Sequence, residues 1–521
     1  MRLTPLLACF SLVLSFAAEP AKRPPNIVLL YSDDIGWGDY GCYGAKVIPT
    51  PAVDRLAQQG TRFTSGYCTS ATCTPSRYSL LTGEYAWRRK GTGILPGDAR
   101  LIIAPGRPTL PASLAKLGYA TGVVGKWHLG LGGESVDWNH RINPCPNEVG
   151  FTYSFIMAAT GDRVPCVFVE NGNVVGLDPK DPIEVSYKKP FPGDPDLKTP
   201  EERAKLKMDW SMGHNMALVN GVGRIGWMKG GKSALWNDET LGETFTDKAC
   251  AFIAANKAKP FFLYYAAHEN HVPRVPNPVH RGKTPLGPRG DAVVAFDDHV
   301  AKILAELDKH GLADDTLVIL TSDNGPVLDD GYKDKAIALN KAAGHAPAGP
   351  FRGGKYSIYE GGTRVSMLAR WPGHTPAGQV SDQIVSQIDF AASFTKLAGG
   401  DPAEFLKIDG LENSGVFMGA KSARDHVIEQ SNQTNLAIRE GDWKYVPAHS
   451  RKGQKAQKPG EVEEPEREKE VVDGQNEQLY DLAKDPGETR NVASDHPDQV
   501  KRLKAKLEES KAKGVAQPLP Q

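Results

Sequence analysis

Four short, uninterrupted apolar runs alternate with segments of helical periodicity, and this alternation limits the folds open to the chain more than any other feature. Apolar runs of this kind are typical of strands that a sheet buries on both faces. We expect strands at 26–31, 120–124, 261–265 and 316–320. We expect helices at 50–59, 110–117, 243–259 and 292–310. This order predicts an α/β fold, in which helices flank a mostly parallel, doubly wound sheet.

Polar residues follow each of the four expected strands. In chain order they are Asp33 and Asp34, Lys126 and His128, His268 and His271, and Asp323 and Asn324. Ligands of doubly wound sheets bind just beyond the carboxyl ends of the strands, so these groups should gather at one edge. Asp and Asn also begin ordinary turns. That explanation suffices for any one strand end, but it is much weaker for four strand ends together.

Four of these side chains offer only oxygen ligands: Asp33, Asp34, Asp323 and Asn324. Oxygen ligands suit Ca²⁺ or Mg²⁺ and do not suit Zn²⁺. Three carboxylates gathered at one edge would also repel one another without a cation. We therefore expect a divalent metal site at the carboxyl edge of the sheet.

The stretch 68–83, CTSATCTPSRYSLLTG, predicts a helix that begins near Cys73. Pro75 fits the first turn of a helix, and Gly83 fits its end. Cys73 would then lie where free N–H groups and the helix dipole favour an anion, and Arg77, one turn further on, adds a positive charge. Taken alone, a cysteine before a helix is most often a small buried hydrophobic residue.

The sequence CTPSR followed by TGEY resembles the C-x-P-x-R signature of the sulfatases, in which the cysteine is converted to formylglycine. The resemblance runs from about residue 26 to the C-terminus. GKWHLG supplies Lys126 and His128, an H-x-P sequence supplies His271, and FRGGKYSIYEGGTR supplies Lys355. His268 does not match the family pattern. The segment between Asn324 and Lys355 is longer than in the family pattern, which predicts an additional loop.

The resemblance implies a mechanism. Cys73, as formylglycine, would join Asp33, Asp34, Asp323 and Asn324 around Ca²⁺, with Mg²⁺ as the alternative ion. The cation and Lys355 would hold the sulfate, and Asp323 would help to activate the attacking hydroxyl group. Proton transfer falls to two histidines: His271 would protonate the leaving oxygen, and His128 would take the proton that triggers sulfate release. Arg77 and Lys126 would fix the formylglycine. The implied partners are a sulfated saccharide and a formylglycine-generating maturase.

The sequence GDRVP places Asp162 beside Arg163 in an irregular stretch. One interpretation is ordinary surface charge. The other is a polar clamp for sugar hydroxyl groups, because loops around strand ends often carry specificity. GDRVP and GPFRGGKYSIYEGG resemble segments of exported bacterial sulfatases that act on 6-sulfated galactose or N-acetylgalactosamine.

Two other functions stay open at this stage. A phosphate or phosphonate monoester hydrolase could share the fold. A glycan-binding protein that never receives formylglycine could retain the same pattern of residues.

The first 18 residues read as a signal peptide, with cleavage after Ala17. The apolar run is too short to span a membrane, and a lipoprotein site at Cys9 is a weaker alternative. We expect an exported protein, periplasmic or secreted. Because 62 basic residues balance 62 acidic residues, the chain has no net charge that would attract nucleic acid.

We expect a catalytic domain at 24–400 and a smaller C-terminal subdomain at 401–521. The latter contains short apolar runs at 436–439, 443–446 and 478–482, a helical pattern at 496–511 and a charge-rich loop at 451–470. These features predict an antiparallel sheet with a helix. Cys145 and Cys166 could form a disulfide in an oxidising compartment, but the sequence does not establish the pairing.

Overall fold

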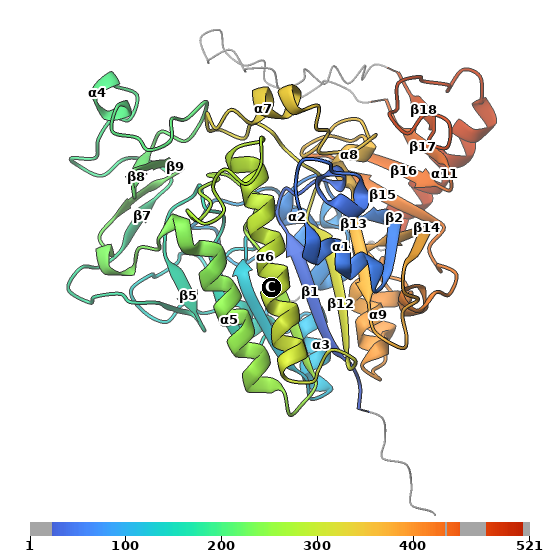
Figure 1. Ribbon diagram of the computed structural model, residues 1–521, viewed down its shortest axis with the longest axis horizontal. Coiled ribbons are helices and arrows are strands. Elements are labelled where there is room, and N and C mark those ends of the chain that lie inside the picture. The colour runs from blue at the N-terminus through green and yellow to red at the C-terminus, as the bar shows by residue number, and fades with distance from the viewer. Residues whose placement is uncertain (1–22, 433–434, 449–475, 514–521) are drawn as a thin grey trace, which may run out of the picture.

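The computed structural model describes residues 23–432, 435–448 and 476–513. The expected signal peptide and the charge-rich stretch 451–470 lie outside these residues. Figure 1 shows a large central sheet between two layers of helices, with a smaller sheet at one side. Within the described ranges, no helix combines the length and the apolar character needed to cross a bilayer.

The central sheet has ten strands in the order β14-β2-β13-β12-β1-β11-β3-β4-β5-β6. Five neighbouring strands in its middle are parallel. They are β12 (Thr316–Ser322), β1 (Asn26–Ser32), β11 (Phe261–Ala266), β3 (Ala120–Lys126) and β4 (Tyr153–Met157). Four of the five are the strands expected from the apolar runs, and their carboxyl ends share one edge.

The outer strands make the sheet mixed. Strand β13 (Arg364–Arg370) is antiparallel to both β12 and β2 (Thr61–Tyr67), and β14 (Gln379–Ser386) completes that side. At the other side β5 (Phe168–Glu170) and β6 (Asn173–Val174) are antiparallel. Strand β2 was not predicted from the sequence, because polar residues interrupt its apolar residues in TRFTSGY.

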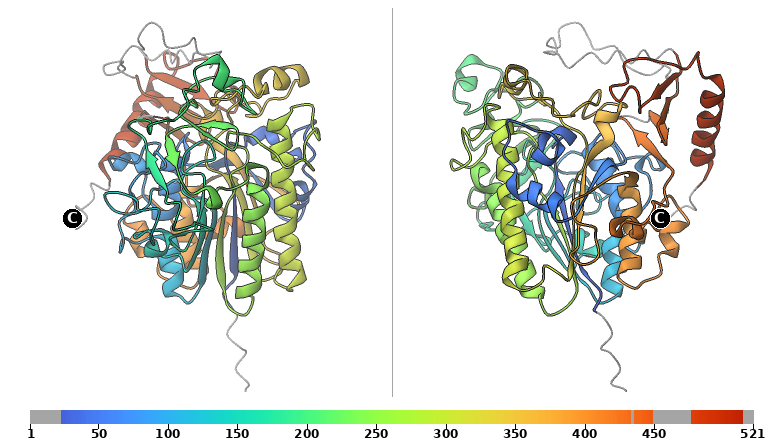
Figure 2. Two further views of the ribbon diagram at one scale, coloured as in Figure 1. Left: turned by 90° about the vertical axis from the view of Figure 1, so that its left-hand side faces the viewer. Right: turned by 45° about the vertical axis from the view of Figure 1, so that its right-hand side comes forward.

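Helices cover both faces of the sheet (Figures 1 and 2). One layer contains α1 (Pro51–Gln58), α5 (Leu241–Asn256) and α6 (Pro288–Lys309), and the other contains α2 (Cys73–Thr82), α3 (Leu110–Lys116) and α9 (Phe390–Leu397). Alternate residues of β1 point to opposite layers: Val28 and Leu30 join the core under α1, α5 and α6, whereas Leu29 and Tyr31 join the core under the second layer. This two-sided burial explains why β1 is apolar throughout.

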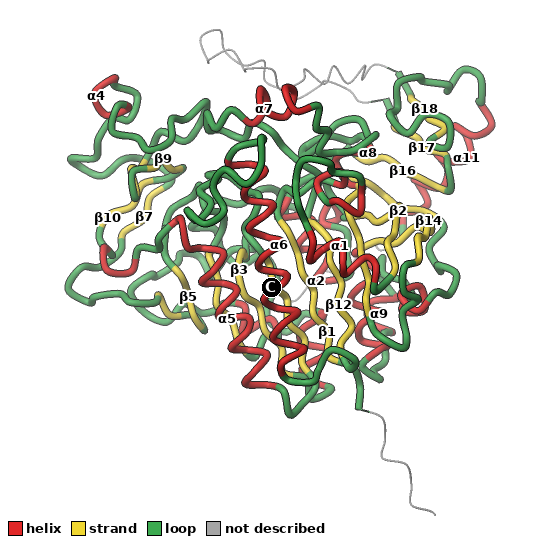
Figure 3. Tube along the Cα trace, in the orientation of Figure 1, coloured by secondary structure: helices red, strands yellow, loops and turns green. Residues whose placement is uncertain are grey.

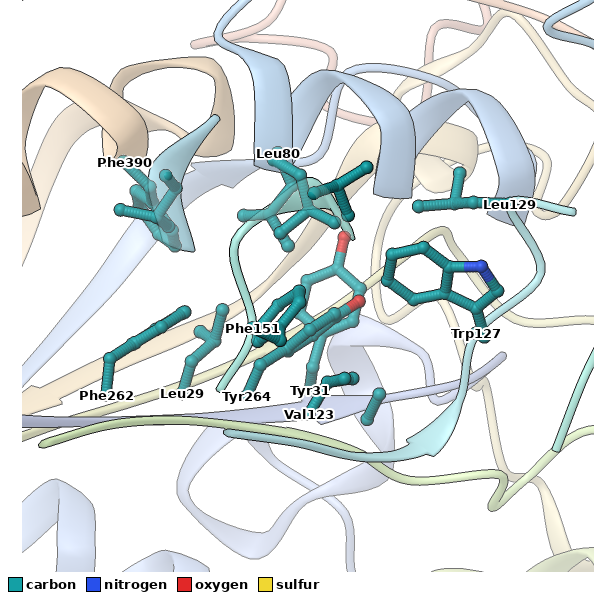
Figure 4. Packing of buried hydrophobic residues seen from close by; sticks show 14 of the residues in the cluster. Leu29, Tyr31, Leu80, Val123, Trp127, Leu129, Phe151, Phe262, Tyr264 and Phe390 are labelled. Atoms are coloured by element: carbon teal, nitrogen blue, oxygen red, sulfur yellow. The ribbon is translucent and has the colours of Figure 1, made fainter. Parts of the chain in front are cut away.

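The second core fixes the helix that begins at Cys73. Figure 4 shows Tyr31 and Tyr264 reaching from neighbouring strands towards Leu80 of α2. All ten residues of α2 are buried, and Gly83 ends the helix in the left-handed conformation (φ +64°). The predicted start and end of this helix are confirmed.

A four-stranded antiparallel sheet forms the C-terminal subdomain. Its strands are β15 (His426–Gln430), β16 (Leu436–Glu440), β17 (Trp443–Val446) and β18 (Gln478–Asp481), and α11 (Pro497–Ala512) packs on them. The predicted fold class, an α/β sheet with a smaller antiparallel sheet and helix, is confirmed.

Shorter elements sit in the long connections, which Figure 3 draws mostly as loops. They are β7 (Glu184–Ser186), β8 (Ala217–Val219), β9 (Val222–Arg224), β10 (Trp227–Lys229), α4 (Pro200–Arg203), α7 (Ala336–Ala343), α8 (Glu360–Thr363) and α10 (Ala403–Leu406). Cys145 and Cys166 are both buried, and neither is in a disulfide with any described cysteine. The structure therefore does not contain the disulfide considered from the sequence.

Candidate active site

Cys73 is the first residue of α2 and is fully buried in the site. Its Sγ lies 3.2 Å from Nδ1 of His128, which follows β3. The other ring nitrogen of His128, Nε2, lies 2.9 Å from the carbonyl oxygen of Leu95. Because a carbonyl only accepts, Nε2 carries the hydrogen and a neutral His128 presents the bare Nδ1 to residue 73. Burial, together with the charge of Lys126, holds the pKa of His128 well below its ordinary value and keeps the ring neutral.

Arg77 lies one turn further along α2 and is buried among acceptors. Its Nε and Nη2 donate to Oδ2 of Asp323 at 3.0 and 2.8 Å, and its Nη1 donates to the carbonyl of Lys126 at 3.0 Å. The Lys126 ammonium lies 2.5 Å from Oδ2 of Asp33 and 3.8 Å from Oδ2 of Asp323. Two buried cations from α2 and β3 therefore hold the carboxylates that follow β1 and β12.

Asp34 links the remaining residues of the site. Its Oδ1 accepts from Nδ2 of Asn324 at 2.7 Å, and its Oδ2 accepts from Nζ of Lys355 at 2.8 Å. Nε2 of His271 lies 4.0 Å from the same Oδ2. The charges of Lys126 and Lys355 also act on the Cys73 thiol, although burial is the largest influence and raises its pKa.

The donor atoms fit a divalent cation. Asp33, Asp34 and His271 each offer a ligand atom, and these three atoms lie within 4.8 Å of one another. Oδ1 of Asp33 and Oδ1 of Asn324 are buried without a hydrogen-bond partner among the described residues. Burial raises the pKa of both carboxyls, and the charge of Asp323 at Asp33 and of Asp330 at Asp34 adds to it, so both carboxyls lack sufficient compensation from the chain alone. A hard cation would supply what these oxygens lack.

Asp162 and Arg163 lie in the loop after β4, and ordinary surface charge does not describe them. Asp162 is buried and accepts from Nη1 of Arg163 at 2.8 Å, and its Oδ2 lies 2.9 Å from Nε2 of His214. Burial alone would raise the pKa of Asp162, but Arg163 and His214 hold it well below the ordinary value. The charge of Arg163 also lowers the pKa of His128, while that of Asp162 opposes the lowering at His271. The pair therefore borders the site.

Two residues of this region were missed from the sequence. His214 contacts Asp162, and Asp330 accepts from Nζ of Lys355 at 2.8 Å and from the hydroxyl of Tyr356 at 2.7 Å. Both lie in irregular loops, where no periodicity points to a site. The length of the connection between Asn324 and Lys355, which contains Asp330, was the one available signal.

Comparison with known proteins agrees with this geometry. A curated N-acetylgalactosamine-6-O-sulfatase from Bacteroides thetaiotaomicron is 45% identical over 98% of this chain and 99% of its own length. Human arylsulfatase A is 31% identical over 97% of this chain and 93% of its own length. A solved structure from a study of glycosaminoglycan metabolism by B. thetaiotaomicron superposes with a TM-score of 0.87 at 44% identity, covering 94% of this chain and all of that one. The sequence model of the Sulfatase family matches residues 25–400, and the chain therefore belongs to the sulfatases, which hydrolyse sulfate esters.

Proposed function

We propose that this protein removes the 6-O-sulfate of N-acetylgalactosamine or galactose in sulfated glycans and releases inorganic sulfate. The environment of residue 73 carries the proposal. The side chain of residue 73, at the start of a buried helix, faces the unprotonated ring nitrogen of His128. Buried cations and carboxylate oxygens surround it. The choice of sugar rests on the relative from B. thetaiotaomicron, which resembles this chain over nearly its whole length.

Two groups complete the proposed site. Cys73, converted to formylglycine by a maturase, supplies a hydrated aldehyde whose hydroxyl group attacks sulfur. Ca²⁺ or Mg²⁺ would be held by Asp33, Asp34, Asp323, Asn324 and residue 73, and it would supply positive charge that polarises the sulfate.

The buried cations of the chain set the charge of the site. Arg77 fixes Asp323 through two hydrogen bonds to Oδ2, which leaves Oδ1 of Asp323 free to accept from the backbone N–H of Asp34 at 3.5 Å. Asp323 helps to activate the attacking hydroxyl group. Lys126 neutralises Asp33, and Lys355, which pairs with Asp34, binds the sulfate oxygens.

The two histidines divide the proton transfers. His128 takes a proton from residue 73, because its Nδ1 already faces that side chain and lacks a hydrogen. His271 gives a proton to the leaving sugar oxygen from Nε2. Nδ1 of His271 lies 2.8 Å from the carbonyl of Val272 and must keep its own hydrogen, so donation from Nε2 requires the imidazolium form. Burial and Lys355 lower the pKa of His271 in the free chain, and the negative charge of a bound sulfate ester would raise it.

Asp162 and Arg163 are proposed to bind the sugar. They border the site, since the charge of Arg163 acts on His128 and that of Asp162 acts on His271, and Arg163 keeps 15% of its side chain accessible. An acceptor beside a donor of fixed geometry matches a pair of neighbouring sugar hydroxyl groups.

We also propose export through residues 1–18 to the periplasm or the medium, and a division between a catalytic domain at 24–400 and a subdomain at 401–521.

Mass spectrometry tests the modification. Trypsin releases residues 63–77, which contain Cys68 as well as Cys73, so fragment ions must locate the change. Protein made with a maturase should carry the lower mass of the aldehyde at residue 73 and the unchanged thiol at residue 68. Unmodified cysteine at both positions, in a host that matures another sulfatase, would contradict the proposal and favour a glycan-binding role.

Substrate comparison tests the reaction. We expect sulfate release from N-acetylgalactosamine-6-sulfate and galactose-6-sulfate, and much slower release from the 4-sulfates. The enzyme should hydrolyse the sulfate ester of a given phenol faster than the phosphate ester of the same phenol. Preference for the phosphate ester, or for a phosphonate monoester, would assign the site to the alternative hydrolase.

A further inference from the structure

The additional loop at 325–354 is attached to a much earlier part of the chain. The backbone N–H of Ser211 donates to the carbonyl of Gly331 at 2.9 Å. The hydroxyl of Tyr332 donates to the carbonyl of Gly223, on β9, at 2.6 Å. Figure 1 shows the loop ahead of α7 beside β8 and β9. The loop is therefore fixed both to β9 and to the chain that leads into β8.

The same loop holds the ring of His214. The ring centroids of His214 and Tyr332 lie 4.4 Å apart. A Cβ at residue 331 would lie 2.0 Å from Cε1 and Nδ1 of the histidine ring. Gly331 also has a φ of +110°, which other residues rarely adopt. The close packing of Gly331 and Tyr332 leaves the ring of His214 little freedom to move.

His214 in turn fixes Asp162. Its Nδ1 lies 2.7 Å from the carbonyl oxygen of Met212, and its Nε2 lies 2.9 Å from Oδ2 of Asp162. A carbonyl and a carboxylate only accept, so the ring carries a hydrogen on each nitrogen and pairs with Asp162 as an imidazolium. Such charge-assisted hydrogen bonds are about twice as strong as those between neutral groups. His214 is therefore a strong and rigid support for the carboxylate.

Asp162 passes this support on to Arg163. Oδ1 of Asp162 accepts from the hydroxyl of Thr160 and from Nη1 of Arg163 at 2.8 Å, and Oδ2 accepts from the same Nη1 at 3.0 Å. Nε and Nη2 of Arg163 donate to no described residue, and 15% of the side chain is accessible. The planar guanidinium is thus fixed along one edge, while its other donors are available to a substrate.

We propose that His214 is a positioning residue for substrate selection. It fixes Asp162 and, through Asp162, the guanidinium of Arg163 that contacts the hydroxyl groups of the sulfated sugar. The additional loop at 325–354 contributes to specificity by holding this histidine. The inference rests on the proposed role of Asp162 and Arg163 in binding the sugar.

Two amide variants separate positioning from packing. His214→Asn keeps a donor near Nδ1 for Met212 but loses the donor to Asp162, whereas His214→Gln places an N–H near Nε2. The measured quantity is kcat/KM for N-acetylgalactosamine-6-sulfate divided by kcat/KM for a small aryl sulfate. We expect this ratio to fall roughly tenfold to a hundredfold in His214→Asn, mainly through KM for the sugar, and to recover most of its value in His214→Gln. His140→Asn is the matched control, because His140 pairs with Asp137 and is 82% exposed.

A double variant tests whether His214 acts through Asp162. In the Asp162→Asn background, His214→Asn should change the ratio by less than about twofold, because the partner is already altered. Near-ultraviolet circular dichroism checks that each variant is folded. If His214→Asn does not fold, Gly331→Ala provides the second test, since its Cβ would displace the ring of His214 and leave the other side chains of the site unchanged.

Three results would overturn the inference. An equal ratio in the wild type and in folded His214→Asn would overturn it and leave the proposed function intact. A loss that persists in full in the Asp162→Asn background would overturn it as well, because His214 would then act independently of Asp162. If the wild type released no sulfate from the sugar, the proposed function would fail and this inference with it.

Discussion

Replacing Lys444 with methionine should destabilise the protein, and the loss should grow with pH. Lys444, on β17, is completely buried against three carboxylates. Its Nζ lies 3.1 Å from Glu360, 2.9 Å from Glu429 and 3.3 Å from Glu488. Glu360 belongs to the same GGKYSIYEGG sequence as Lys355 and begins α8, so this ion cluster joins the C-terminal subdomain to the active-site loops.

The magnitude follows from the burial of all partners. Removing one member of a buried ion pair costs about 3–5 kcal/mol, because the remaining charge is left uncompensated. Arg364 and Arg439 still pair with Glu360, at 3.2 and 3.5 Å, but Glu488 loses the only cation within 4.0 Å among the described residues. We therefore expect a loss of about 3–5 kcal/mol at pH 8.

The pH dependence has a defined sign. Burial raises the pKa of Glu429 to about 7 and that of Glu488 to about 8. The folded protein thus holds protons that the unfolded chain releases near pH 4.5, and stability falls as pH rises from about 4.5 to 8. For each carboxyl that stays protonated in the folded protein, the free energy of unfolding falls by about 1.4 kcal/mol per pH unit over this range. Without Lys444 the carboxyls hold their protons more firmly, so the variant should lose more than the wild type between pH 6 and pH 8.

Denaturant unfolding at pH 6 and pH 8, followed by tryptophan fluorescence, measures both effects. Lys484→Met is the matched control, because Lys484 is 84% exposed and pairs with Asp481 at the surface of the same subdomain. A Lys444→Met protein within about 1 kcal/mol of the wild type at pH 8, or equally destabilised at both pH values, would refute this description of the cluster.

Three further predictions concern the site. Asp162→Asn should raise KM for the sulfated sugar at least tenfold and leave a small aryl sulfate nearly unaffected; an equal change for both substrates would remove Asp162 from sugar binding. Gly325→Ala should abolish sulfate release, because a Cβ would overlap the carbonyl oxygen of Gly361 beside Asn324, whereas Gly133→Ala, with open space around it, should not. Removing divalent cations with a chelator should lower the melting temperature and the rate of sulfate release. Adding Ca²⁺ at about 100 times its Kd should restore about 2.7 kcal/mol of the free energy of unfolding. An unchanged melting temperature would contradict a cation at Asp33 and Asp34.

The sequence predicted the parts of this fold that burial on two faces dictates. The run 26–31 predicted a strand buried on both faces, and its carboxyl end placed Asp33 and Asp34 at the carboxyl edge of the parallel strands. Strand β2 was missed because Thr61–Tyr67 mixes polar and apolar residues near the side of the sheet. Its partners, β13 and β14, come from more than 290 positions later in the chain, and local periodicity carries no information about such pairings.

The same division holds for the site. Residues that end regular strands, such as Lys126 and Asp323, could be placed together because parallel strands share an edge. His214 and Asp330 reach the site from irregular loops, where only tertiary packing decides which side chain faces inward. The burial of Asp162 was likewise beyond the sequence pattern, since an Asp-Arg pair in a loop looks the same exposed or buried.

The rate of sulfate release by Cys73→Ala tests the central claim most directly. The small side chain fits the space of the buried thiol, so the variant should fold as the wild type does, with unchanged circular dichroism. Made beside a maturase and assayed on N-acetylgalactosamine-6-sulfate, it should release no sulfate above the uncatalysed rate. Release at the wild-type rate would show that the reaction does not pass through residue 73.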